Sequence, residues 1–320
     1  MSKGIPNTYQ HFVPRCYLEH WGHEKDNQKD SFFLYCYNKA AKKSHTDNVD
    51  KTCGIDDFYT ISQQTLSRCE NKTLSPLSTE KGFFAENVES NLDECLPQFE
   101  QACQKCVQYN TKNFPLSVTE KFNFAHHIVI QFVRHPNQRS RFVEPVKEGY
   151  EKMIEVLKQL VAKIEKDDNY TRLKTSISCD DAAVHNFLFD EKFVGDAARK
   201  LSERKWHFYY SPNKNICTSD NPVVVIPSKE STLPRDMGLN QDGSIVFYAI
   251  LPELLLVITS EDASTNAHVI DSTFSELPED ISEFYHAALF ENATNKIFNY
   301  NNNFERIKQY INGKAKNAKR

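Results

Sequence analysis

Apolar side chains recur at two different periods along the chain of 320 residues, and the change of period divides it into three parts. Residues 31–39 (SFFLYCYNK) and 56–61 (DDFYTI) are rich in aromatic side chains and end in polar turns, which predicts strands. From about residue 79 the apolar side chains lie three or four positions apart, which predicts a long amphipathic helix that Pro97 kinks or splits. Short apolar runs return after residue 204 and predict further strands, at residues 205–210, 215–218, 223–226, 244–251, 254–259 and 297–300.

The next helix has the best-marked limits, because it opens with the capping box SVTE at residue 117 and stops before Pro136. One face is apolar. The opposite side carries a polar stripe made of His127, Gln131 and Arg134. A helix that is apolar nearly all round is usually buried, so the polar stripe either lines an internal pocket or forms a solvated seam. The sequence leaves both alternatives open.

A third helix is predicted from near Pro145. Apolar residues follow a regular spacing along one side, and charged residues occupy the rest of its surface. This pattern predicts a surface helix whose apolar side packs on the protein. The residues of that side are Val146, Tyr150, Met153, Leu157, Leu160 and Ile164.

Strands, then helices, then strands and a helix predict an α+β fold with a mainly antiparallel sheet. The sheet is built from the N-terminal and C-terminal strands, the last two long ones joined by a hairpin-like break at Pro252, and the helical middle segment packs on it. We find no linker rich in Gly, Pro or Ser and only nine glycines, so we predict a single domain over residues 1–320. Its parts are the N-terminal arm and strands (1–62), the helical segment (79–203), the sheet and helix (204–300) and a tail (301–320), whose basic end from Lys314 is predicted to be disordered.

Composition narrows the class of protein. A net charge of −4 argues against a protein that coats nucleic acid through bulk charge. No apolar run approaches the roughly 20 residues that span a bilayer, and the N-terminus lacks a signal-peptide core, so we predict a cytoplasmic protein without a membrane segment. Nine cysteines, an odd number, indicate reduced thiols. Cys103 and Cys106 lie on an apolar helix face, which favours buried thiols over redox or metal chemistry.

Two stretches combine imidazole and guanidinium groups. In QHFVPRCYLEHW (10–21), His11 and Arg15 lie beside a proline, where they could serve as general acid or base and as phosphate clamp. The alternative is an ordered arm with His11 hydrogen-bonded inside. In FVRHPNQRSRF (132–142), three arginines within eight residues, Arg134, Arg139 and Arg141, could bind an anion in bidentate fashion. The alternative is that these cations lie near the C-terminus of a helix, where they interact favourably with its macrodipole.

A third stretch, TSDNPV (218–223), places Asp220 and Asn221 between two predicted strands. Asp and Asn before a proline suit a sheet corner whose side chains satisfy local backbone donors. If the turn instead projects Asp220 into a cavity, its carboxylate and the adjacent amide could bind a metal or orient a water or a histidine.

Taken together, H-F-V-P-R-x-Y-L, R-x-P-x-x-R and S-D-N-P-V resemble a largely bacterial family of proteins known only as a domain of unknown function. The resemblance spans nearly the full chain and includes the pair Phe58-Tyr59 and an acidic helix with Glu86 and Glu89. The chain departs from the usual pattern at Cys16, where an aromatic residue is common, and at His135, where a small residue is common. The resemblance implies that seven residues converge in space: His11, Arg15, Glu89, Arg134, Arg139, Asp220 and Asn221.

Such a set would suit an intracellular phosphoesterase, and we predict a nuclease of the toxin or phage-defence type acting on RNA, DNA or nucleotides. His11 would be the general acid or base, and Asp220 with Glu89 would bind a divalent metal such as Mg²⁺ or tune His11. The substrate would be held by Arg15, Arg134, Arg139 and Asn221. Motifs of nucleotide-triphosphate motors, dinucleotide oxidoreductases, serine hydrolases and zincins are missing from the sequence.

Two other functions stay open. In the first, the protein is a non-enzymatic binding or structural module, and the same residues form a buried polar network that ties the N-terminal arm to the sheet and helix. In the second, the aromatic strand FFLYCY recognises a peptide or protein, which would require a large exposed apolar patch.

Overall fold

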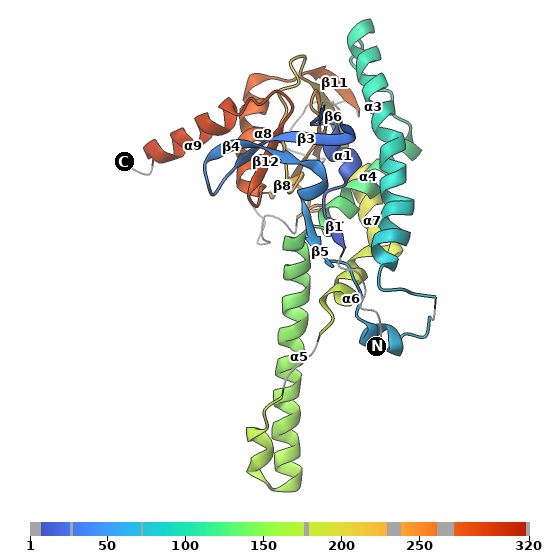
Figure 1. Cartoon of the computed structure of the whole chain (residues 1–320), viewed down its shortest axis with the longest axis vertical. Helices are drawn as coiled ribbons and strands as arrows, with labels where there is room; N and C mark the ends of the chain where they lie inside the picture. Colours follow the sequence, from blue (N-terminus) through green and yellow to red (C-terminus); the bar gives the residue numbers. More distant parts are fainter. Residues whose placement is uncertain are drawn as a thin grey trace.

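Two five-stranded sheets and the helices around them make up most of the computed structural model (Figure 1). The structure describes residues 8–25, 28–71, 73–175, 179–228, 238–260 and 272–317. The first sheet joins N-terminal and C-terminal segments, because β12 pairs on one side with β3 and on the other with β7, all antiparallel. Its strands are β2 (Gly22–Lys25), β3 (Gln28–Asn38), β4 (Lys43–Asn48), β7 (Thr218–Ser219) and β12 (Lys296–Asn299).

The second sheet is the apolar centre of the fold. It has the order β11-β6-β10-β9-β8, and every pair is antiparallel except β11 with β6. The predicted hairpin at Pro252 is confirmed, since β9 and β10 pair across it. The middle strands are buried on both faces, which explains their almost unbroken apolar runs. The strands are β6 (Lys205–Tyr210), β8 (Val223–Ile226), β9 (Ile245–Leu251), β10 (Leu254–Thr259) and β11 (Thr273–Glu276).

A short two-stranded ladder positions the N-terminal arm. β1 (Tyr9–His11) pairs antiparallel with β5 (Gly54–Asp56), so that His11 lies opposite Gly54. After Pro14 the arm continues as α1 (Arg15–Glu19). The arm is therefore ordered and places His11 at a fixed point of the fold.

Helices occupy the middle of the chain and the C-terminal end, which confirms the α+β prediction and the mainly antiparallel sheets. The middle contains α2 (Gln63–Arg68), the π-helix η2 (Ser78–Glu89), α3 (Ser90–Tyr109), α4 (Val118–Val133), α5 (Pro136–Glu165), α6 (Asp181–Asn186) and α7 (Glu191–Ser202). The C-terminal part contains α8 (Glu279–Asn292) and α9 (Glu305–Asn317). Short 3₁₀ turns are η1 (Val49–Lys51), η3 (Asp168–Arg172) and η4 (Phe187–Phe189).

The observed ends of two helices can be compared with the ends predicted from the sequence. The capping box at the start of α4 is confirmed, since the Ser117 hydroxyl accepts from the Glu120 amide and the Glu120 carboxylate accepts from the Ser117 amide. The third helix begins at Pro136 instead of near Pro145. Proline is favourable in the first turn, and His135 caps this helix by accepting a hydrogen bond from the amide of residue 137 at 3.2 Å.

α5 projects from the sheets as a long arm, and the chain turns back along it through η3 (Figure 1). The predicted packing of its apolar side on the protein is wrong. Tyr150, Met153, Leu157 and Leu160 are each about half exposed, and Ile164 is 73% exposed. The periodicity correctly predicted a helix, but an amphipathic pattern does not specify what covers the apolar side.

The C-terminal tail is largely helical, so the predicted disorder from Lys314 is wrong for the part that the structure describes, up to residue 317. Ile307 of α9 is fully buried, and Tyr310 donates a hydrogen bond to Glu291 of α8 at 2.8 Å. Lys314 donates to the same carboxylate at 2.6 Å. The basic residues of α9 thus pair with an acidic neighbour on α8.

Buried apolar residues from both five-stranded sheets and from α3, α4, α7 and α8 belong to one core. Cys103 and Cys106 are each 2% exposed, as predicted for buried thiols, and the nine cysteines are free. The strand FFLYCY is buried or half-buried along its length, so it does not supply the exposed patch that peptide recognition would require. Within the described ranges, no helix is both long and apolar enough to cross a membrane.

Candidate functional site

Arg134, at the C-terminal end of α4, is the centre of a buried polar group that we call the Arg134 cluster. Its side chain is fully buried, and Nη2 lies 3.0 Å from Glu89 Oε1. The same nitrogen donates to the backbone carbonyl of His11. The guanidinium carbon lies 4.1 Å from the centre of the Phe84 ring, and the Tyr59 hydroxyl donates to the Arg134 carbonyl at 2.8 Å. The cluster therefore ties the N-terminal arm, η2 and α4 together.

The π-helical pitch of η2 makes this arrangement achievable. Glu80 and Glu89 are nine residues apart, which is two and a half turns of an α-helix and would place them on opposite faces. With about 4.4 residues per turn, a π-helix brings the two glutamates back to nearly the same face, with Phe84 between them. All three side chains act on Arg134, through charge or through the ring. Long π-helices are rare and often lie at functional sites.

Glu80 is the member of the cluster that the sequence analysis missed. Its pKa is raised to about 7, mainly by burial and also by the negative charge of Glu89, while Arg134 opposes the shift. Its Oε2 is buried without a hydrogen-bond partner among the described residues. The only sequence signal is a glutamate nine positions before Glu89, and that spacing is meaningful only once the helix is known to be of the π type.

Replacing Glu80 by glutamine is expected to stabilise the protein at about pH 8 and to change little near pH ~4. Because the folded-state pKa is raised, the folded chain holds this proton more tightly, so stability falls as pH rises from 4.5 toward 7. An uncharged amide removes that loss, worth about 1 to 2 kcal/mol after allowance for solvent screening. Urea unfolding over this pH range measures the difference in unfolding free energy between Glu80→Gln and the wild-type protein. The exposed Glu86→Gln is the control, and an effect of Glu80→Gln that is equal at every pH would contradict a protonated carboxyl.

His11 and Arg15 occupy different environments on the N-terminal arm. The His11 ring is half-buried, its Nε2 lies 3.3 Å from the Val49 carbonyl, and burial lowers its pKa. Arg15 is exposed and pairs with Asp50 at 2.9 Å and with Glu19 at 3.4 Å. At neutral pH the pair therefore presents a neutral imidazole and a surface cation.

Arg139, one turn into α5, is bound to the chain rather than free for an anion. Its Nη1 donates to the Phe58 carbonyl, and its guanidinium lies 4.3 Å from the centre of the Phe58 ring. The F-Y pair therefore holds two arginines, since Tyr59 contacts Arg134 and Phe58 contacts Arg139.

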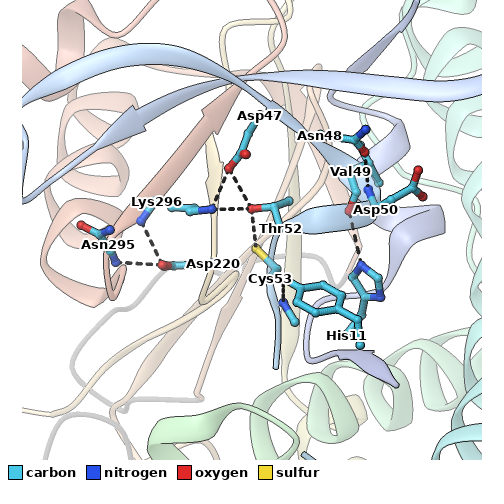
Figure 2. Close-up of polar contacts among 12 residues, drawn as sticks. His11, Asp47, Asn48, Val49, Asp50, Thr52, Cys53, Asp220, Asn295 and Lys296 are labelled. Carbon is cyan, nitrogen blue, oxygen red and sulfur yellow. Dashed lines mark hydrogen bonds and ion pairs between the residues drawn. The ribbon is translucent and has the colours of Figure 1, made fainter. Parts of the chain in front are cut away.

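Asp220 acts as a cap for the connection between α8 and β12 (Figure 2). Its carboxylate accepts three backbone hydrogen bonds, from Thr294 at 2.8 Å, Asn295 at 2.8 Å and Lys296 at 2.9 Å. Its side chain is almost completely buried, and that burial raises its pKa although the three amides oppose the shift. The sheet-corner alternative correctly predicted that Asp220 accepts from backbone amides, but these amides are distant in sequence instead of local.

Asn221 extends the same connection. Its Nδ2 donates to the Asn292 carbonyl at 3.2 Å, and Asn292 Nδ2 donates back to the Asn221 carbonyl at 2.9 Å. The Ser219 hydroxyl bridges the amide and carbonyl of Asn221. These reciprocal bonds explain why three polar residues stand between two buried strands.

The seven residues expected to converge fall into separate groups. His11, Glu89 and Arg134 come together at the end of α4, whereas Asp220 and Asn221 bind the α8–β12 connection. In Figure 2 the Asp220 carboxylate points toward residues 295 and 296, and the His11 ring points toward residue 49, with residues 52 and 53 between them.

A divalent metal was predicted at Asp220 and Glu89. Among the described residues, the group of metal-ligand side chains that lies close together is a different one, made of Cys36, His45 and Asp47, with ligand atoms within 4.8 Å of one another. Asp47 already pairs with Lys296 Nζ at 2.7 Å, so a metal there would compete with an ammonium group. The predicted pair belongs to no such group in the described part of the chain.

The polar stripe of α4 is internal, which decides between the two alternatives left by the sequence. His127 is 7% exposed and Gln131 1% exposed. His127 Nε2 lies 3.3 Å from the Tyr248 hydroxyl, while its Nδ1 is buried without a hydrogen-bond partner among the described residues. Burial lowers the His127 pKa to about 3, so this imidazole is neutral at physiological pH.

A cavity of about 500 Å³ lies between η2 with α3 on one side and α4 on the other, and His127 lines it. Glu94 and Glu120 also line the cavity, and the described lining residues include no Lys or Arg. Most of the wall is apolar. Five phenylalanines contribute to it: Phe83, Phe99, Phe114, Phe122 and Phe124.

The described residues thus define an α+β protein whose polar motif residues are largely buried and bound within the chain. The chain belongs to the family described as Protein of unknown function (DUF4238), whose model matches residues 9–303. This confirms the expected membership of a family of unknown function over nearly the whole chain. Neither the curated proteins nor the solved structures contain a match to it.

Proposed function

We propose that the protein is a small-molecule binding module in which the motif residues form the rigid frame and the cavity between α3 and α4 is the ligand site. The observation that carries this proposal is the cavity of about 500 Å³, whose mostly apolar wall includes the side chain of His127. Ligand pockets of drug-sized compounds are typically about 300–1,000 Å³, mostly apolar, with a few placed polar groups.

The motif residues support the role of a frame. Arg134 and Asp220 each bind several groups of the chain that are distant in sequence. Buried polar networks rigidify a structure when their members are satisfied. The Asp220 carboxylate meets this condition with three amides, whereas Arg134 Nε and Nη1 are buried without hydrogen-bond partners among the described residues. Arg134 lies two turns after His127 on α4, so the Arg134 cluster fixes the helix that carries the ligand-facing imidazole.

The lining favours a ligand with a flat apolar body and a protonated amine. Phe99 and Phe124 have ring centres 4.4 Å apart and offer an aromatic surface to such a body. Glu94 and Glu120 favour a cation, and cations also bind aromatic faces. The neutral His127 does not repel the cation.

A titration with three dansyl compounds tests this preference, since they share one fluorescent body but carry a protonated alkylamine, no charge, or a carboxylate. The amine is expected to bind tightest and the carboxylate about ten-fold more weakly or worse, because the cavity bears two carboxylates. Glu94→Lys should remove the preference for the amine. Equal binding of all three compounds would overturn the assignment of ligand charge.

A substitution that fills the cavity with a bulky side chain distinguishes specific binding in the cavity from adsorption of the ligand to the protein surface. Ala102 lines the cavity, and Gln101 is its exposed neighbour on α3. Ala102→Trp is expected to weaken binding of the dansyl compound with the protonated alkylamine about ten-fold, whereas Gln101→Trp leaves this binding unchanged. Equal effects of the two variants on binding would show that the cavity is not the ligand site.

Phosphoester cleavage is the second candidate function, and the environment of His11 favours it. The half-buried ring lies near the charges of Glu89, Arg15 and Arg134, a mixture that could hold a phosphate and move a proton. This function requires cleavage in panels of RNA, DNA and nucleotides and its loss in a folded His11→Ala variant. A lack of cleavage by the wild-type protein on these panels would rule out phosphoester cleavage as the function.

A further inference from the structure

We infer that α5 is a dimerisation arm that pairs antiparallel with the α5 of a second copy of this chain. The inference is independent of the proposed ligand site, because none of the cavity residues lies on α5. It starts from the apolar side chains of α5 that the described structure leaves uncovered.

These side chains have the spacing of a coiled-coil seam. Starting at Tyr150, the next members follow at intervals of three, four, three and four residues, as at positions a and d of a heptad. We call Tyr150, Met153, Leu157, Leu160 and Ile164 the exposed seam, which is about 21 Å long at 1.5 Å per residue. Each member is between 49% and 73% exposed.

The opposite side of α5 is already covered, so the exposed seam is a distinct surface. Ala162 is buried on that side, where the chain returns through η3, and the half-buried Ile154 lies between it and the seam. Two further valines lie at the margins of the seam, Val156, which is 55% exposed, and Val161, which is 37% exposed.

The area is of the size that a stable dimer needs. The seam and its two marginal valines expose on the order of 700 Å² per copy, against about 800 Å² per partner in a standard specific interface. The largest apolar patch on a typical monomer is about 300–600 Å². Closed two-fold dimers are the commonest oligomers, and their interface uses the same patch on both copies, which this seam provides.

Charge and shape favour the antiparallel direction. Residues 147–156 contain two Lys and three Glu, net −1, and residues 157–166 contain three Lys and one Glu, net +2. An antiparallel pair brings unlike halves together. α5 joins the sheets at one end and is free at the other (Figure 1), so antiparallel arms keep the two bodies at opposite ends of the pair. Parallel arms would bring both bodies to one end at a helix spacing of only about 8–10 Å.

Sedimentation velocity tests the oligomeric state. The wild-type protein is expected to sediment as a dimer of the 37.0 kDa chain, and Leu157→Glu as a folded monomer, because a buried carboxylate would face the partner helix. Val107→Glu, at a 44% exposed position on α3, is the control and should remain dimeric. A monomeric wild-type protein at about 50 μM, well above the Kd of a specific dimer, or a dimeric Leu157→Glu, would overturn the inference.

A charge swap tests the direction. We propose the antiparallel register that places Met153 of one copy opposite Leu157 of the other and Tyr150 opposite Leu160. Mixing Met153→Lys with Leu157→Glu then creates a Lys–Glu pair and leaves the second Met–Leu contact intact. Each variant alone is expected to be monomeric, and the mixture to form a heterodimer. Parallel arms would not place these two residues opposite each other. Failure of the mixture to associate while the wild-type protein dimerises would therefore overturn the antiparallel arrangement.

Discussion

Replacing Arg134 by methionine is expected to lower the free energy of unfolding by about 3 kcal/mol. The methionine keeps much of the packing against Phe84 but leaves Glu89 and the His11 carbonyl without their donor. Removing one partner of a buried ion pair typically costs about 3–5 kcal/mol, and we place this case at the lower end because Glu89 is 26% exposed and can be partly hydrated. The midpoint of urea unfolding at neutral pH measures the loss.

The matched control is Arg15→Met. Arg15 also pairs with two carboxylates, but its side chain is 46% exposed, and surface ion pairs contribute at most about 1 kcal/mol. The two arginines come from motifs that look equally charged in the sequence. A loss at Arg134 no greater than that at Arg15 would show that the Arg134 cluster does not hold the arm, η2 and α4 together.

Replacing Asp220 by alanine is expected to cost at least about 3 kcal/mol. The change leaves three part-buried amides of the α8–β12 connection without their acceptor, and each unsatisfied buried donor costs about 1–3 kcal/mol. Asp220→Asn retains one carbonyl oxygen and should lose less. Thermal and urea unfolding measure both, with the exposed Asp56→Ala as control.

The pattern of losses also distinguishes a frame from a catalytic site. A carboxylate held for catalysis is often dispensable for stability, whereas a cap is not. If Asp220→Ala unfolds like the wild-type protein, the capping role is wrong, and a role in chemistry gains support. Amide hydrogen exchange at residues 294–296 gives a local readout, since protection there is expected to fall first.

Local signals in the sequence predicted local structure well. The capping box of α4, the buried thiols of α3 and the hairpin at Pro252 depend on neighbouring residues, so their patterns were sufficient. The polar stripe of α4 was also correctly located, although its burial depends on what packs against it. The start of α5 at Pro136 was missed because its first-turn proline was interpreted only as the end of the preceding helix.

The candidate site was harder to predict because its contacts depend on distant segments. A single sequence does not reveal that residues 294–296 present three amides to Asp220, or that a π-helix turns Glu80 toward Arg134. The same residue types suit a catalytic site and a buried network, and only their partners distinguish the two. Charge and spacing therefore singled out candidate residues but did not predict the contacts that they make.

The place of β12 between β3 and β7 has a consequence for synthesis on the ribosome. β3 is translated early, and β2 and β4 can pair with it at once, but β12 lies about 260 residues later. Residues 35–38 of β3 therefore keep one edge unpaired through most of translation. An unpaired edge can pair with another nascent chain, and its pairing is slow because it closes a long loop. Premature termination before residue 296 would leave this edge open, which makes chaperone capture of truncated chains the expected fate.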